Sequence, residues 1–143
     1  MPWDIFLSYE DEDIGTVEVF REHLMQEDID LVFHEYPIKE PFESLVAKDE
    51  KSRITEMLEK ASITVVLIGR TTYADKWVDW EVRKSAELGK GLLGVRLHSD
   101  LDHIIPRALK DFRVEVSGPD PRSVAEAVER IARETGHFGF ETG

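Results

Sequence analysis

The chain has 143 residues, no cysteine and a formal net charge of −12, and these properties exclude several kinds of protein. The length fits one domain, the lack of cysteine excludes a disulfide framework or a thiolate metal site, and the negative charge disfavours non-specific binding to nucleic acid or anionic lipid. The start of the chain has no signal-peptide pattern, and no uncharged run approaches the roughly 20 residues that span a bilayer. We therefore expect a cytoplasmic protein with no nucleic-acid and no membrane partner.

The first predicted elements are a buried strand and an amphipathic helix. Residues 3–9 (WDIFLSY) become continuously apolar, as in a central parallel strand, and end in Ser8 and Tyr9. A short acidic turn follows. Its last residue, Asp13, can cap a helix that extends to about Glu27, with apolar residues at helical spacing.

A second short strand, residues 31–34, leads into a long loop. Pro37 and Pro41 interrupt regular structure in this loop. Loops of this length are often lids or binding loops, and a simple tethered connection is the alternative. His34, at the end of the strand, is a weak candidate for a loop site, with packing or an ordinary hydrogen bond as the alternative. A helix over residues 51–60 follows the loop.

The central stretch of the sequence predicts a strand, helix, strand unit. Residues 62–68 are uncharged and rich in β-branched side chains, which is typical of a strand buried on both faces. Asp75 can cap a helix over residues 75–88, and Gly89 lies where that helix must stop. Residues 92–97 form the next apolar run, so the unit is expected to be right-handed and parallel.

The last third of the chain predicts an edge strand and a final helix. Residues 112–116 (FRVEV) alternate apolar and charged side chains, as an edge strand with one wetter face does. Asp120 and Pro121 are residue types that begin helices, and Gly136 is expected to end this one. The loop that precedes the strand has room for one helical turn.

Five strands alternating with about five helices predict an α/β domain. We expect a flavodoxin-like three-layer domain whose parallel five-stranded sheet has the strand order 2-1-3-4-5. The predicted domain covers residues 1–136, and residues 137–143 form a C-terminal tail.

One acidic side chain is the candidate for chemistry. Glu81 lies four residues after Trp77, so both side chains share a helix face and lean toward the crevice at the carboxyl ends of the strands. An indole there offers a flat surface to an aromatic base, and a carboxylate can act as a nucleophile or face an oxocarbenium-like carbon. Lys84 could pair with Glu81 or form a surface pair. The alternative is a solvated glutamate beside a core tryptophan.

The sequence argues against two other functions, those of a phosphoacceptor receiver domain and of a protein with a glycine-rich phosphate-binding loop. Residues 10–13 are all acidic, as in phosphoacceptor receiver domains, but the third strand ends in Ile-Gly-Arg and has no acceptor aspartate. The chain also has no P-loop and no GxGxxG motif after its first strand. A histidine and aspartate cluster lacks the spacing of a metal motif, so we expect it to be solvated and predict no metal site; its members are His98, Asp100, Asp102 and His103.

Two stretches carry a resemblance to a known family. Residues 4–13 (DIFLSYEDED) and 67–95 (LIGRTTYADKWVDWEVRKSAELGKGLLGV) resemble Toll/interleukin-1 receptor (TIR) domains. The resemblance is strongest to prokaryotic TIR-like proteins related to those of the Thoeris antiphage system, and it covers most of residues 4–97. It departs at residues 34–41 (HEYPIKEP), where many TIR domains have Arg-Asp-x-x-Pro-Gly, and at Glu10, where arginine is frequent.

The resemblance implies an enzyme that hydrolyses or cyclises NAD and releases nicotinamide, in antiviral signalling. NAD is then the substrate, and no cofactor is needed. The resemblance also implies self-association and a downstream effector that senses the product. It makes Glu81 the catalytic residue and Trp77 the family's preceding, substrate-binding tryptophan. It places the other predicted substrate-binding residues beside the nicotinamide ribose, namely Ser8, Tyr9, Gly69 and Thr72.

Two alternatives stay open. A TIR-like domain can serve as an interaction module without chemistry, which suits the acidic surface and the atypical proline loop. Nucleoside deoxyribosyltransferases share the fold and also use a glutamate on a comparable helix, and they differ in the acceptor of the sugar.

Overall fold

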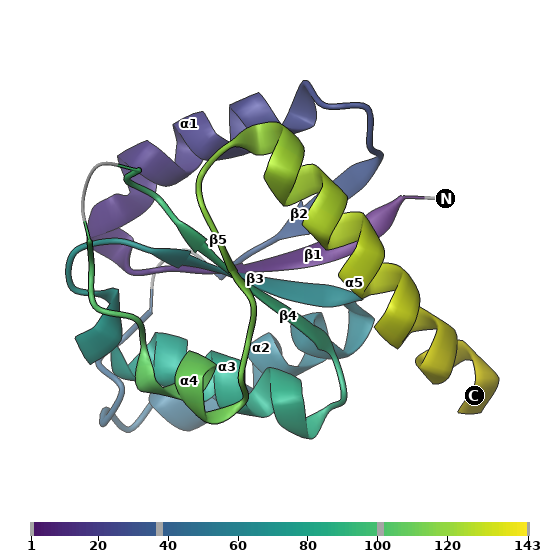
Figure 1. Cartoon of the computed structure of the whole chain (residues 1–143). Helices are drawn as coiled ribbons and strands as arrows, with labels where there is room; N and C mark the ends of the chain where they lie inside the picture. The colour runs from purple at the N-terminus through teal and green to yellow at the C-terminus, as the bar shows by residue number, and fades with distance from the viewer. Residues whose placement is uncertain (1, 37–38, 100–101, 143) are drawn as a thin grey trace.

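A parallel five-stranded sheet forms the middle layer of the protein (Figure 1). The computed structural model describes residues 2–36, 39–99 and 102–142. The strand order is β2-β1-β3-β4-β5, which confirms the order predicted from the sequence. The strands are β1 (Trp3–Ser8), β2 (Leu31–His34), β3 (Ile63–Ile68), β4 (Gly91–Arg96) and β5 (Val116–Ser117).

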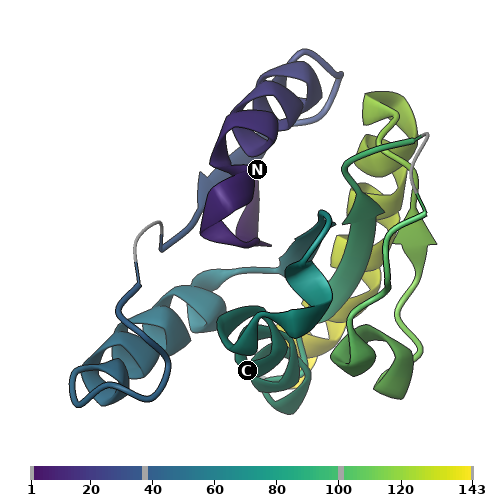
Figure 2. The ribbon, with the colours of Figure 1, turned by 90° about the vertical axis from the view of Figure 1, so that its left-hand side faces the viewer.

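Helices cover both faces of the sheet (Figure 2). On one face lie α1 (Ile14–Met25) and α5 (Pro121–Thr142). On the other lie α2 (Ala47–Lys60), α3 (Lys76–Glu87) and α4 (Arg107–Asp111). Short 3-10 turns, η1 (Asp11–Asp13) and η2 (Thr72–Ala74), follow β1 and β3. They stand at the carboxyl ends of the strands, where sheets of this kind bind their ligands.

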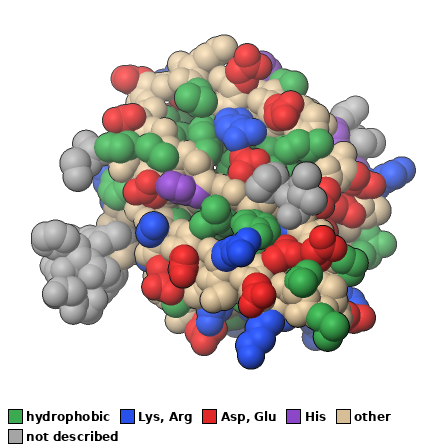
Figure 3. All heavy atoms as spheres, turned by 180° about the vertical axis from the view of Figure 1, so that it is seen from behind, with side chains coloured by type: hydrophobic (Ala, Val, Ile, Leu, Met, Phe, Trp, Pro, Cys, Tyr) green, Lys and Arg blue, Asp and Glu red, His purple; other side chains and the backbone are tan. Residues whose placement is uncertain are grey.

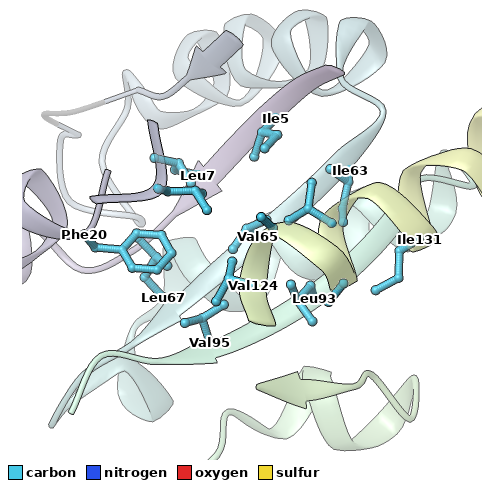
Figure 4. Close-up of a cluster of buried hydrophobic side chains, with 14 of the residues drawn as sticks. Ile5, Leu7, Phe20, Ile63, Val65, Leu67, Leu93, Val95, Val124 and Ile131 are labelled. Atoms are coloured by element: carbon cyan, nitrogen blue, oxygen red, sulfur yellow. The ribbon is translucent and has the colours of Figure 1, made fainter. Parts of the chain in front are cut away.

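The side chains of the central strand are buried on both faces of the sheet. All six side chains of β3 are buried, as the uncharged, β-branched run predicts. Alternate strand residues, Leu7 and Val65 among them, pack under α1 and α5, where Phe20, Val124 and Ile131 complete the cluster (Figure 4). The remaining strand residues pack against α2, α3 and α4. This core fixes the position of α3 against β1 and β3.

The signals predicted for α3 are confirmed. The carboxylate of Asp75 accepts a hydrogen bond of 3.0 Å from the backbone N–H of Val78 and so caps the helix. Gly89 follows the helix with φ of +73°, a left-handed conformation that favours glycine. β3, α3 and β4 therefore form the expected parallel unit.

Two predictions about helix starts are wrong. Asp13 precedes α1, but its side chain accepts no hydrogen bond from the helix; its carboxylate lies instead against the backbone of Gly69. The second helix begins at Ala47, four residues before the predicted start, because Ala47 packs in the cluster beneath the sheet. The loop between β2 and α2 is correspondingly shorter than predicted.

Two predictions in the last third also need correction. The fifth strand comprises only Val116–Ser117, because the backbone turns after α4: Arg113 has φ of +52°, and Phe112 is 46% exposed. Helix α5 continues past Gly136 to Thr142, since one helical glycine costs only about 1 kcal/mol and need not end a helix. The division into a domain of residues 1–136 and a tail stays a prediction.

The surface is rich in acidic side chains, as the net charge of −12 implies. Acidic side chains are spread over the face seen in Figure 3, with Lys and Arg among them. Within the described part of the chain, no helix combines the length and the apolar character that crossing a membrane requires.

Candidate active site

Glu81 is buried at the carboxyl end of β1. Its side chain, on α3, is 0% exposed. Its Oε1 accepts a hydrogen bond of 2.6 Å from Ser8 Oγ, at the end of β1. Lys39 Nζ, in the segment between β2 and α2, lies 3.8 Å from Oε2, and no hydrogen-bond donor among the described residues reaches that oxygen. Glu81 is therefore held by one hydrogen bond and one longer ionic contact.

The surroundings of Glu81 raise the pKa of its carboxyl toward 7. Burial is the main cause and raises the pKa of this carboxyl from 4.5 to about 7. Lys39 and the Ser8 hydrogen bond act in the opposite direction, and the charges of Asp75 and Asp11 raise the pKa further. Near pH 7 the carboxyl can therefore hold or release a proton, as acid–base and nucleophilic groups in enzymes do.

Hydroxyl groups fix the helix turn that carries Glu81. Ser85 Oγ donates a hydrogen bond of 2.7 Å to the backbone carbonyl of Glu81. The same hydroxyl lies 2.8 Å from Thr64 Oγ1 on β3. Both residues are fully buried, so these bonds tie the middle of α3 to the central strand and limit the positions that the carboxylate can take.

Trp77 shares the buried face of α3 with Glu81 but has other neighbours. Its indole Nε1–H donates a hydrogen bond of 2.8 Å to the carbonyl of Glu40. Its ring meets Phe42 edge-on at 5.0 Å and Trp80 at 6.1 Å. With 8% of its surface exposed, Trp77 packs beneath the segment that follows β2, and its role toward substrate stays a prediction.

The other predicted substrate contacts are also buried. Tyr9 donates a hydrogen bond of 2.5 Å to Glu35, which also accepts one from Arg21; burial, followed by the bond to Glu35, raises the pKa of Tyr9. Thr72 Oγ1 accepts a hydrogen bond of 2.8 Å from the N–H of Gly69. Of the predicted set, Ser8 is the residue that bonds Glu81. The substrate contacts assigned to all five remain predictions.

Sequence reasoning missed Lys39 as the cation at the site. Lys84, which was considered as a partner of Glu81, lies 3.1 Å from Glu87 instead. The side chain of Lys39 is 8% exposed, an unusual burial for lysine. Its place in a long proline-containing loop was the available signal, because such loops often cover sites.

The histidine-rich segment makes local contacts. His98 Nδ1 lies 3.0 Å from His103 Nε2, and Asp102 lies 3.6 Å from Arg96. Asp100 is outside the described residues. The described residues contain no group of three or more His, Cys, Asp or Glu side chains placed to hold a metal ion. His34 makes a hydrogen bond of 2.9 Å with Asp4, the ordinary role weighed for it.

Comparison with known proteins identifies the family. Residues 6–102 match the family model described as Thoeris protein ThsB, TIR-like domain. The chain belongs to this family. It is also 32% identical over 71 residues to a protein of Bacillus cereus (strain MSX-D12) named "Putative cyclic ADP-D-ribose synthase ThsB1". That alignment covers 50% of this chain and 33% of the relative, so the match extends over one third of the relative's length.

The fold is shared with a solved TIR structure. The RPS4 and RRS1 TIR domain heterodimer aligns with 94% of this chain and 98% of its own, with a TM-score of 0.50 and 18% identity. The TIR domains of the activated Roq1 resistosome, which directly recognizes the pathogen effector XopQ, align with 66% of this chain and 57% of theirs, with a TM-score of 0.46 and 19% identity. At 18% identity the likeness to the RPS4 and RRS1 heterodimer extends to the fold alone.

Proposed function

We propose that this TIR-like protein cleaves NAD at the bond between the ribose C1′ and the nicotinamide nitrogen, with Glu81 as the catalytic residue. The observation that carries the proposal is a fully buried carboxyl at the end of β1 whose pKa is raised to about 7. The family, and the name of the Bacillus cereus relative, support NAD chemistry. The product would be a linear or cyclic ADP-ribose signal for a separate effector in antiviral defence.

Cleavage of the C1′–N bond of NAD needs one anionic group close to the ribose C1′. When the C1′–N bond breaks, its electron pair leaves with nicotinamide, which becomes a neutral ring, and positive charge develops on the ribose. The ionised Glu81 carboxylate can stabilise this charge or bond to C1′. Water then adds to C1′ and loses a proton, or the adenine ring attacks the same carbon. Ser8 would orient the carboxylate through its 2.6 Å hydrogen bond.

Catalysis requires Glu81 to become accessible. The carboxylate is 0% exposed, with Lys39 beside it, so NAD can reach it only after a neighbouring part of the protein moves. We propose that the segment that carries Lys39 is the part that moves. Self-association, which we also propose, is one way to drive that movement, because a partner that binds the open form shifts the equilibrium toward it.

The test is nicotinamide release from NAD over a range of protein concentrations. We expect the wild type to release nicotinamide and Glu81→Gln to be at least about 100-fold slower, since it keeps the size of the side chain and removes the anion. Glu87→Gln is the matched control, because Glu87 is on the same helix with a 67% exposed side chain. Equal rates for the wild type and Glu81→Gln would refute the assignment.

A second candidate function, an interaction module without chemistry, is favoured by one observation. Glu81 is sealed from solvent, as a structural acid would be. This function predicts a concentration-dependent increase in mass by light scattering that Glu81→Gln leaves unchanged, with no nicotinamide release at any concentration.

A further inference from the structure

The segment that covers Glu81 is held in place by side chains. We call residues 39–43 (KEPFE), which lie between β2 and α2, the strap. Among the described residues, no backbone–backbone hydrogen bond involves Lys39 or Glu40. The position of Lys39, whose Nζ is 3.8 Å from Glu81 Oε2, therefore depends on the side chains that contact the strap.

Glu50 on α2 binds the strap at the residue next to Lys39. Its two carboxylate oxygens lie 3.0 and 3.2 Å from the backbone nitrogen of Glu40 and accept its N–H. Glu50 is only 7% exposed, and a hydrogen bond from an N–H group to a carboxylate is stronger than one between neutral groups. This bond fixes the peptide that joins Lys39 to Glu40, and so fixes the point from which Lys39 extends to Glu81.

The strap has a second attachment on α3. The carbonyl of Glu40 accepts a hydrogen bond of 2.8 Å from Trp77 Nε1–H, so both backbone polar groups of Glu40 are bonded to side chains of neighbouring helices. Phe42 packs edge-on against Trp77 at 5.0 Å, and its ring centroid lies 4.1 Å from Lys51 Nζ. Glu40 itself is exposed, so the helices hold its backbone and leave its side chain to solvent.

A carboxylate is unexpected at position 50. The other buried residues of α2 are Ala47, Ile54 and Leu58, which share a helix face with Glu50, and an apolar side chain there would continue their stripe. Burial of a charge is costly unless a partner compensates it, and here the N–H of Glu40 does so. Because water can bond both groups once they separate, the contact stabilises the closed strap and still allows it to open.

We propose that Glu50 is a positioning residue that holds the strap over Glu81 and thereby controls access to this carboxyl. Its bond to Glu40 keeps the strap closed, and loss of that bond shifts the protein toward the open form. The link from opening to NAD cleavage rests on the proposed function. The contact between Glu50 and the strap does not, so it can be tested in protein without NAD.

Chemical modification of Glu81 measures how often the strap is open. A water-soluble carbodiimide with an amine converts accessible carboxyl groups to amides, and trypsin then releases residues 77–83 (WVDWEVR) as one peptide for mass spectrometry. Asp79, in the same peptide and with a 47% exposed side chain, is the internal reference. We expect Glu50→Met to raise the modification of Glu81 relative to Asp79 about tenfold or more, as loss of a hydrogen bond to a charged group does.

The choice of variants separates the hydrogen bond from packing. Methionine fills the space of Glu50 but is only a weak acceptor, whereas Glu50→Gln keeps an amide oxygen and should give a smaller increase than Glu50→Met. Glu56→Met is the matched control, because Glu56 is exposed on the same helix, and its result should equal that of the wild type. Trp77→Phe, which removes the second attachment and keeps an aromatic ring, should also raise the modification of Glu81.

Two results would refute the role of Glu50. One is modification of Glu81 that is equal in the wild type and in Glu50→Met, and the other is an equal rise in Glu50→Met and Glu56→Met. Melting temperatures show whether each variant is folded. If Glu50→Met is not, Glu50→Gln and Trp77→Phe decide, and modification at the wild-type level in both would overturn the proposal.

Nicotinamide release from NAD, measured on the same proteins, separates this proposal from the proposed function. If Glu50 controls access, kcat/KM of Glu50→Met should rise by the fold-change seen in modification. Increased modification with an unchanged kcat/KM would overturn control of access. If no variant releases nicotinamide while Glu50→Met exposes Glu81, the role of Glu50 in holding the strap stands and the proposed enzyme function fails.

Discussion

Ser8 and Glu81, 73 residues apart in the chain, are joined by a buried hydrogen bond of 2.6 Å. It connects the end of β1 with the middle of α3, and it holds the carboxyl whose pKa is raised to about 7. Both residues come to this point because β1 and β3 are paired in the sheet and α3 packs across them. The bond is therefore a property of the fold that can be tested with or without NAD.

Removal of the Ser8 hydroxyl should raise the pKa of Glu81. In Ser8→Ala the carboxylate loses the hydrogen bond that stabilises its charged form, so it takes up a proton at higher pH. The measurement is the pH titration of the Glu81 carboxyl carbon by NMR. Ser117→Ala is the control, because the Ser117 hydroxyl donates to the carbonyl of Gly118 at the β5 edge of the sheet. A titration unchanged in Ser8→Ala would contradict the geometry.

The free energy of unfolding should depend on pH through the titration of Glu81. Its folded-state pKa of about 7 is above its ordinary 4.5, so between these values the folded state binds more protons than the unfolded state. The contribution of Glu81 to the free energy of unfolding therefore falls as pH rises from about 4.5 to 7, by roughly 3 kcal/mol at most.

Urea unfolding of the wild type and Glu81→Gln at pH 5 and pH 8 measures this contribution. The variant should gain stability relative to the wild type at the higher pH, since glutamine has no proton to lose. Glu87→Gln, on the exposed side of the same helix, should show a difference that is nearly independent of pH. A constant difference for Glu81→Gln would mean that Glu81 is not a raised-pKa group.

Local patterns predicted most of what positions this site. The uncharged run of β3, the Asp75 cap and the glycine after α3 are signals within a few residues of one another, and the structure has all three. Burial of Glu81 also has a local signal, because it lies on the helical stripe between Val78 and Val82, which are both buried.

Contacts made by loops could not be predicted in the same way. Lys39 contacts Glu81 from a segment with no hydrophobic period. The Asp13 side chain makes no capping hydrogen bond to α1 and packs against Gly69 instead. Such contacts depend on where the strands place the ends of distant loops, which spacing along the chain does not encode. The same limit explains why Lys84, the nearer cation in sequence, was a wrong alternative.

Replacement of Lys39 should move the acid limb of the pH dependence of NAD cleavage. In Lys39→Met the aliphatic part of the side chain is kept, and the charge that lowers the pKa of Glu81 is lost. If the ionised carboxylate is the active form, kcat/KM should then begin to rise at a higher pH than in the wild type. Lys76→Met is the matched control, because Lys76 pairs with exposed Glu43. Identical profiles for both variants would exclude Lys39 as the partner of Glu81.

The contact between Asp13 and Gly69 predicts a coupling that can be measured directly. In Gly69→Ala the new methyl group would lie 2.2 Å from Asp13 Oδ2 and 2.7 Å from its carboxyl carbon, so the carboxylate must shift. We expect a loss of about 1–3 kcal/mol in the free energy of unfolding, as for other overpacked sites. Most of this loss should disappear in the Asp13→Ala background, which gives a double-mutant coupling of about 1 kcal/mol or more.

Gly118→Ala is the control for that cycle, because no atom lies within 4 Å of a Cβ built at Gly118. Urea unfolding of the single and double variants supplies the four free energies. If Gly69→Ala costs the same with and without the Asp13 carboxylate, then the strain is in the backbone of the segment after β3 and the carboxylate does not rest on Gly69. One cycle therefore tests whether the Asp13 carboxylate packs against Gly69.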